Sequence, residues 1–275
     1  MAKDIDMKHK YIKSRSLFFY DKCFASKRRG HIDVVVPTTD KDLAKLSLVI
    51  PSLVNIQHHI DNIYIVAPVS EFIKDFCAKY NCKFIDENTV LDLTIHDIDY
   101  KPCGMDRSGW IFQQLLKLNC DQFCKNEYIL VIDSDTVFTR QQFFIKRDKM
   151  VFDCSNEYHT PYFTAYKKLL GLNNRFGLSF VAHHMLFKKT FLQEMKTKIE
   201  EHTHKKWYQA ILDNLDFNQT SSFSEYETYG NYMYYNHRHQ MLIREWYNKS
   251  TKSTEYDKIT DKEKYKTISM HSYNE

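Results

Sequence analysis

A chain of 275 residues is long enough for two average domains or one large α/β domain, and its 43% hydrophobic and 27% charged residues exclude wholesale disorder. Only six glycines and five prolines exclude collagen-like and linker-rich architectures. The net charge of +4 is smaller than a dedicated nucleic-acid binder would carry, so we expect no nucleic-acid partner.

Residues 1–30 form a basic N-terminal segment. They hold nine lysines and arginines against three aspartates. Such a segment can meet anionic lipid headgroups, at about 1 kcal/mol for each basic residue close to the surface; a solvated basic surface is the alternative. The chain has no run of 18 apolar residues, no apolar signal core and no CxxC among its seven cysteines. These features predict a cytoplasmic protein, either free or peripheral on the inner face of a membrane.

Four strand-like segments alternate with three helical segments in the first half of the chain. The expected strands are HIDVVVP (31–37), NIYIVAP (62–68), CKFIDE (82–87) and YILVIDSD (128–135). The expected helices are 42–56, 70–80 and 109–118, and Pro51 should kink or divide the first. This order is typical of a parallel sheet covered by helices on both faces, with ligands bound beyond the carboxyl ends of the strands.

The second half is less regular. Residues 180–202 indicate a strand carrying His183 and His184, followed by an amphipathic helix, and Ser222 and Ser224 are candidate N-caps of a further helix. One of the two histidines could line an acceptor pocket, or both could be satisfied core side chains. We therefore expect an α/β fold with a mostly parallel sheet flanked by helices, built as a single domain with a C-terminal elaboration.

Asp133 and Asp135 stand two residues apart at the end of a buried apolar strand. Neighbouring carboxylates raise each other's pKa unless a cation lies between them, and Mg²⁺ and Mn²⁺ prefer such oxygen ligands. The pattern therefore favours a divalent metal site. The alternative is that one aspartate caps a helix and the other faces solvent.

Taken with VVVPTT, NIYIVAP, SGWIFQQLLKL and FSEYETYG, the run YILVIDSDTVF resembles nucleotide-sugar glycosyltransferases of the GT-A fold, notably bacterial and viral members that make surface polysaccharides. The resemblance spans residues 31–275 and implies a GT-A-like, Rossmann-type domain. Residues 31–140 would be its nucleotide-binding half and 141–275 its acceptor-binding half and tail. It implies metal-dependent transfer from a nucleotide diphosphate sugar, with a UDP-sugar favoured, to a hydroxyl of a glycan or glycolipid.

The resemblance also implies roles for particular residues. Pro37 and Thr38 would contact the nucleotide base, and Asp133 and Asp135 would hold Mn²⁺ or Mg²⁺, with His271 as a further ligand. Such a cation neutralises the leaving diphosphate.

Further candidates combine residue chemistry with the resemblance. If the reaction inverts the anomeric centre, a base must take the acceptor proton. Glu225 and Glu227 lie in the region where the resemblance implies this base, and we expect only one of them to act. Glu225 is preferred because it would lie in a first helical turn; a helix-capping acid is the alternative. On the donor side, Arg107 could meet a phosphate and Gln113 and Gln114 the ribose or donor sugar, with Ser134 beside Asp133.

Two other functions compete with this one. The run ILVIDSDTV also fits the nucleophile motif of haloacid-dehalogenase-type phosphatases, in which Asp133 would accept the phosphoryl group and Asp135 would act as acid and base. That motif normally opens its domain, whereas three strand–helix units precede it here. The second rival is a nucleotide-sugar-binding protein without catalysis.

Overall fold

The β-branched run after Gly30 forms strand β1 (His31–Pro37), in which every residue but the first is buried. In the computed structural model, which describes residues 30–271, β1 is the middle strand of a five-stranded sheet with the order β3-β2-β1-β4-β8. The other strands are β2 (His59–Ala67), β3 (Lys83–Asp86), β4 (Tyr128–Ile132) and β8 (His184–Lys188). The expectation for the basic segment 1–30 falls outside the described residues, apart from Gly30.

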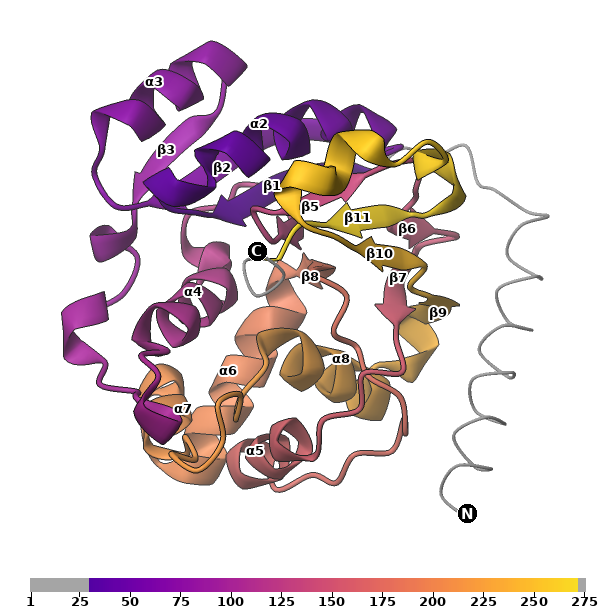
Figure 1. Cartoon of the computed structure of the whole chain (residues 1–275). Coiled ribbons are helices and arrows are strands. Elements are labelled where there is room, and N and C mark those ends of the chain that lie inside the picture. Colours follow the sequence, from indigo (N-terminus) through magenta and orange to yellow (C-terminus); the bar gives the residue numbers. More distant parts are fainter. Residues whose placement is uncertain (1–29, 272–275) are drawn as a thin grey trace.

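The predicted mostly parallel sheet is confirmed. Strands β1 to β4 pair in parallel, and β8 adds an antiparallel edge beside β4. Figure 1 shows α2 (Leu43–Ser52) and α3 (Glu71–Tyr80) on one side of the sheet, and α4 (Ser108–Leu118), α6 (Lys189–Thr203) and α8 (Glu225–Asn236) on the other. The remaining helices are α5 (Thr160–Leu170) and α7 (Trp207–Asp213). This is a mixed α/β fold whose sheet is flanked by helices.

Pro51 does not divide its helix. It lies in the last turn of α2, which ends one residue later and continues as a 3₁₀ turn over Leu53–Asn55. Since proline has no N–H to donate to the carbonyl four residues earlier, and its ring crowds that carbonyl, the α-helix ends at Ser52, directly after Pro51. The predicted cap of α8 is confirmed, because the Ser224 hydroxyl accepts a hydrogen bond from the Glu227 N–H at 3.2 Å.

Two three-stranded sheets bring the end of the described chain back to the main sheet, which sequence periodicity did not indicate. One has the order β10-β11-β5 and the other β6-β7-β9. Their strands are β5 (Thr136–Phe138), β6 (Ile145–Lys146), β7 (Lys149–Cys154), β9 (Met241–Glu245), β10 (Asn248–Ser250) and β11 (Thr267–Ser269). Because β11 runs antiparallel to β5, with Ser269 opposite Thr136, the residues after β11 lie beside those before β5.

One hydrophobic core joins the two halves of the chain. Its buried side chains run from Ile32 in β1 to Met270 after β11, and include Leu115 of α4, Leu186 of β8 and Tyr229 of α8. None of the helices within residues 30–271 combines the length and the apolar character needed to cross a membrane.

Gly230 lets α8 pack closely against Phe180 in this core. A Cβ at Gly230 would lie 2.4 Å from Cγ of Phe180, whose side chain is fully buried. We expect Gly230→Ala to lower the free energy of unfolding by about 1–3 kcal/mol, because this overpacking outweighs the gain of up to about 1 kcal/mol that alanine brings to a helix interior. Urea denaturation measures the change.

Gly109→Ala is the matched control. Gly109 also lies in a helix, but its nearest neighbour would be Cδ1 of Ile95 at 3.5 Å, an ordinary contact. This variant should be as stable as the wild type or slightly more so. Equal stabilities of the two variants would contradict the close packing of α8 on Phe180.

Candidate functional site

The two aspartates lie where the sheet ends. Strand β4 closes at Ile132, and a turn in which the Thr136 N–H donates to the Asp133 carbonyl at 3.1 Å leads into β5. The Asp133 N–H donates to the carbonyl of His183 at 2.9 Å, which fixes the turn against the start of β8. Asp133 and Asp135 are therefore held at the carboxyl end of the parallel strands, as the sequence pattern predicts.

Three side chains contact the carboxylate of Asp133. Lys117 Nζ donates to Oδ1 at 2.5 Å, the Tyr226 hydroxyl donates to Oδ1 at 2.8 Å, and His183 Nδ1 lies 3.0 Å from Oδ2. Burial alone would raise the pKa of Asp133, but the Lys117 charge and the His183 hydrogen bond outweigh it and hold that pKa well below its usual range. Asp133 is therefore an ionised carboxylate in a fixed orientation.

Lys117 joins three elements through one buried ammonium. Its side chain, 3% exposed, projects from α4 and donates to Asp133 after β4 and, at 2.7 Å, to Oε1 of Glu225 in α8. Burial would lower the pKa of Lys117, but the charges of Asp133 and Glu225 raise it above its usual value. Burial raises the pKa of Glu225, and Lys117 opposes part of that shift.

Asp135 pairs with the last described residue of the chain. His271 Nδ1 lies 3.2 Å from Asp135 Oδ2, and the Met270 N–H donates to the Asp135 carbonyl at 3.0 Å. The His271 ring lies 4.3 Å from the His183 ring, and His183 also contacts Trp246, at 4.8 Å between ring centroids. The structure thus brings two carboxylate–imidazole pairs side by side, Asp133 with His183 and Asp135 with His271.

His183 has a left-handed backbone, with φ of 55°, which is unfavourable for a residue with a side chain. This conformation occurs where the chain enters β8 and lets His183 turn toward Asp133 while the next residue, His184, points into the protein and binds Asp153 at 2.9 Å. The histidine pair therefore divides into one site residue and one core residue. Backbone strain of this kind occurs preferentially at functional sites.

The cluster carries an excess of negative charge. Asp133, Asp135 and Glu225 provide three carboxylates, and Lys117 provides one ammonium. Among residues 30–271, the Asp133–His183 and Asp135–His271 donors form two pairs rather than one compact group of three. Carboxylate and imidazole are nonetheless the donor types that Mn²⁺ accepts, and a divalent cation would balance the charge.

The expected nucleotide-side residues are close to the cluster in the fold. Pro37 ends β1, and its carbonyl accepts a hydrogen bond from Gln113 Nε2 of α4 at 3.3 Å. Thr38, 2% exposed, donates its N–H to the Val66 carbonyl of β2 at 2.9 Å. Ser134, between the two aspartates, is also buried. Gln113 therefore supports the end of β1.

Three other candidates make contacts within the protein. Gln114 Oε1 accepts from the Glu225 N–H at 3.0 Å and so ties α4 to α8. Arg107 Nε donates to the Thr220 carbonyl at 3.2 Å, and its guanidinium covers the Trp110 ring at 4.3 Å. Glu227 has no exposed surface, and accepts hydrogen bonds from Ser179 Oγ at 2.6 Å, the Phe180 N–H at 3.1 Å and Asn231 Nδ2 at 2.7 Å. Glu225, and not Glu227, thus stands beside the aspartates.

Sequence reasoning did not name Tyr226, and it placed Lys117 with Gln113 and Gln114 on a polar helix stripe that could reach the donor, without predicting its contact with Asp133. The available signal was proximity in sequence to candidate site residues: Lys117 lies on the same helix as Gln113, and Tyr226 directly follows Glu225. No pattern in the sequence, however, indicates that a lysine of one helix and a tyrosine of another meet the same carboxylate.

A cavity of about 340 Å³ adjoins the cluster. Its lining comes from the start of α2 and the end of the chain: Lys41, Asp42, Ala44, Lys45, Leu48, Ser253 and Met270. Burial and the charge of Asp135 raise the pKa of Asp42, which places this cavity within electrostatic reach of the site. A cavity of about 600 Å³ beside Lys196 and Trp207 shares no residue with the cluster.

Comparison with known proteins gives the family. The chain belongs to a family of unknown function, DUF6492, whose model matches residues 29–275. No curated protein matches the chain.

Several solved structures are similar to this one at low sequence identity. The galactosyltransferase LgtC, in complex with donor and acceptor sugar analogues, is 14% identical over 86% of each chain, with a TM-score of 0.45. Mouse xyloside xylosyltransferase 1 is 13% identical, over 89% of this chain and 99% of that one, with a TM-score of 0.48. The glycosyltransferase GlyE of Streptococcus pneumoniae TIGR4 is 15% identical, over 70% of this chain and 45% of that one, with a TM-score of 0.35. At these identities and TM-scores, the likeness assigns no residue role to this chain.

Replacing Lys117 tests the buried ion pairs. Lys117→Met would leave Asp133 and Glu225 as buried carboxylates without their cation, and we expect it to lower the free energy of unfolding by about 3–5 kcal/mol in urea denaturation. Adding Glu225→Gln to this variant removes one of the uncompensated charges and should recover part of the loss.

Lys74→Met is the control. Lys74 makes an exposed pair with Glu71 at 2.7 Å on α3, and such surface pairs contribute about 0–1 kcal/mol. If Lys117→Met were no less stable than Lys74→Met, the buried ammonium would not hold these three elements together.

Glu227 makes stability depend on pH. Burial raises its pKa from 4.5 to about 7, although its three hydrogen bonds oppose the shift. A carboxyl whose folded-state pKa is raised stabilises the fold fully below the unfolded value, and this contribution is lost as the pH rises through the folded value. Between pH 4.5 and pH 7, the wild type should therefore lose up to about 1.4 kcal/mol of this contribution per pH unit.

Glu227→Gln removes this titration, so its free energy of unfolding should fall less over the same interval. Glu71→Gln, which changes an exposed glutamate of α3, should keep the wild-type slope. Parallel slopes for the wild type and Glu227→Gln would show that Glu227 is not protonated in the folded protein.

Proposed function

We propose that this protein is a metal-dependent, GT-A-like glycosyltransferase that moves a sugar from a nucleotide diphosphate sugar, with a UDP-sugar favoured, to a hydroxyl of a glycan or glycolipid. The observation that carries the proposal is the pairing of Asp133 with His183 and of Asp135 with His271 at the carboxyl end of β4. Ligands of open α/β sheets bind at this end. The glycosyltransferases whose solved structures are similar to this protein are consistent with the proposal.

The donor set fits Mn²⁺, which accepts imidazole beside carboxylate, whereas Mg²⁺ would bind through the carboxylates. Asp135 and His271 would be the principal protein ligands, because both oxygens of Asp133 already have partners in Lys117, Tyr226 and His183. Asp133 would complete the site from its fixed position. When bound, the cation would supply Lewis-acid neutralisation of the leaving diphosphate.

The chain's own residues would prepare this site. Lys117 holds Asp133 ionised and in place, and Glu225 holds Lys117, so we propose that Glu225 is a positioning residue and assign no reacting role to Glu227. The cavity beside Met270 would receive part of the nucleotide. Pro37 and Thr38, at the end of β1, do not line it and remain the proposed contacts of the base. Arg107 lies in the loop before α4, where an anionic group of the donor could still reach it.

Two further proposals concern the acceptor and the location of the protein in the cell. Residues 141–275 would provide the acceptor half, and the acceptor would belong to a surface polysaccharide. The basic segment 1–30 would let a cytoplasmic enzyme meet an anionic membrane that carries a glycolipid acceptor.

Nucleotide binding tests the proposal directly. Calorimetric titration of UDP, GDP and CMP into the purified protein, with and without Mn²⁺, should show binding of one nucleotide that requires the metal, and UDP is the one we expect. Asp135→Ala should weaken this binding by at least about tenfold, because it removes a ligand that directly faces the cation.

Asp75→Ala is the control, since Asp75 is an exposed carboxylate on α3, away from the cluster. It should bind as the wild type does. Absence of nucleotide binding, together with hydrolysis of a phosphate ester that Asp133→Asn abolishes, would reject the transferase in favour of the phosphatase. Metal-dependent binding without transfer or hydrolysis of any donor sugar would support the non-catalytic binding protein.

A further inference from the structure

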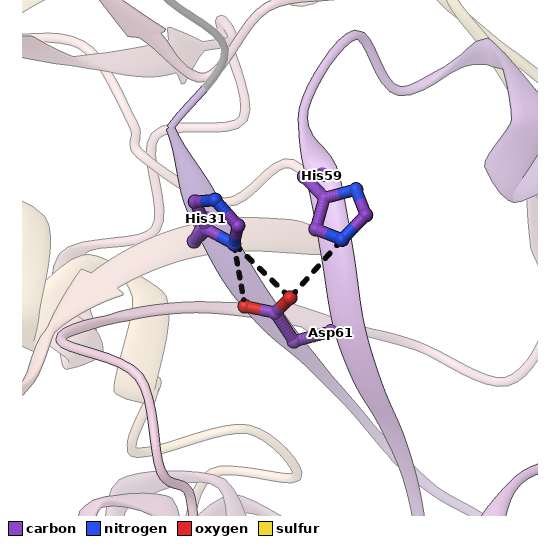
Figure 2. Close-up of side chains that lie close together, drawn as sticks. All are labelled: His31, His59 and Asp61. Carbon is purple, nitrogen blue, oxygen red and sulfur yellow. Dashed lines mark hydrogen bonds and ion pairs between the residues drawn. The ribbon is translucent and has the colours of Figure 1, made fainter.

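A second cluster of metal-binding residue types lies at the opposite end of the sheet. His31 Nδ1 lies 2.9 and 3.0 Å from the two oxygens of Asp61, and His59 Nε2 lies 3.3 Å from Asp61 Oδ1. One donor atom from each of the three residues lies within 4.8 Å of the other two. Figure 2 shows both imidazole rings turned toward the carboxylate between them. All three residues are at the amino ends of β1 and β2, whereas Asp133 and Asp135 follow the carboxyl end of β4.

Strand register brings the two histidines together. His31 and His59 are direct partners in the parallel pairing of β1 with β2, so their side chains leave the same face. Pairing then passes from Ile32–Ile60 to Asp33–Asn62, which leaves Asp61 as the extra residue of a bulge. Bulges redirect side chains and are common beside functional sites. Here the bulge allows Asp61 to face both rings.

A second layer of contacts orients Asp61. Asn126 Nδ2 donates to Asp61 Oδ2 at 2.7 Å and to Asp33 Oδ1 at 3.0 Å. Asp33 is itself fully buried and accepts the N–H groups of Lys125 and Asn126 at 2.7 and 2.9 Å. The buried carboxylate of Asp33 therefore orients the amide of Asn126, which in turn orients the exposed carboxylate of Asp61. Metal-ligating carboxylates are held by outer hydrogen bonds of this kind.

We propose that His31, His59 and Asp61 form a binding site for a divalent transition-metal ion, with Zn²⁺ as the fitting member of the class. Zinc binds imidazole nitrogen and carboxylate oxygen at about 2.0–2.2 Å in tetrahedral geometry, which separates its ligand atoms by roughly 3.4 Å. The distances from Asp61 to the two rings, 2.9 to 3.3 Å, require little adjustment. Two imidazoles with one carboxylate favour zinc, nickel or iron over magnesium or calcium.

Because the three side chains are exposed, a fourth coordination position of the bound ion would be open to solvent. The side chains of His31 and His59 are each 64% exposed, and that of Asp61 is 29% exposed. Bound zinc would join the first residue of β1 to the start of β2 and so fasten the amino end of the central strand pair. This role is independent of the proposed function, because none of the three residues belongs to the Asp133–Asp135 cluster.

Equilibrium dialysis of the tag-free, full-length protein against Zn²⁺, with bound metal measured by atomic absorption, tests this site. The wild type should bind one more equivalent of zinc than His59→Ala or Asp61→Asn at the same free zinc concentration. Zinc should also raise the melting temperature of the wild type more than that of either variant, because an ion that binds only the folded state stabilises it.

Two variants serve as controls. His239→Ala removes an exposed histidine outside the cluster and should bind as much zinc as the wild type. Asp135→Ala should retain the zinc equivalent that His59→Ala loses, which separates this site from the candidate active site. Equal zinc contents of the wild type, His59→Ala and Asp61→Asn would overturn the proposal, and so would loss of that equivalent in Asp135→Ala alone.

Discussion

The buried ammonium of Lys117 is the interaction on which the candidate site depends. A charge that is 3% exposed must be paired, and Lys117 finds Asp133 at the end of β4 and Glu225 at the start of α8. One side chain thereby fixes a helix on the face of the sheet, the turn that carries the aspartates, and a helix more than a hundred residues later in the chain. Tyr226, next to Glu225, reaches the same carboxylate.

A second constraint acts through the backbone. The antiparallel pairing of β11 with β5 carries the chain back across the fold and sets His271 beside Asp135. The left-handed turn at His183 brings another imidazole to Asp133 from the start of β8. The cluster is thus assembled from five separate stretches of chain at the carboxyl end of the parallel strands, and its three carboxylates exceed its one ammonium. A divalent cation or a cationic group is the natural complement of such a site.

The two ends of the sheet present different electrostatic environments. At the carboxyl end, the charged groups are mostly buried, and each shifts the pKa of its neighbours. At the amino end, His31, His59 and Asp61 are accessible to solvent, and only Asp33 beneath them is buried. A buried, charge-coupled cluster with an excess of carboxylates suits binding of a cation in a fixed geometry, whereas exposed donors with one oriented carboxylate suit simple capture of an ion.

The sequence by itself determined the α/β class, the strands β1 to β4 with their helices, the N-cap at Ser224, and the position of Asp133 and Asp135 at a strand end. These features follow from local periodicity and capping, which neighbouring residues encode. Only the tertiary structure decided that β8 joins the sheet antiparallel and that Lys117 and Tyr226 meet Asp133. It also decided that Glu225 rather than Glu227 lies at the site. At the other end of the sheet, it decided that a bulge turns Asp61 toward two histidines. These contacts join residues far apart in the chain, so they depend on strand order, register and helix packing, which no short window of sequence specifies.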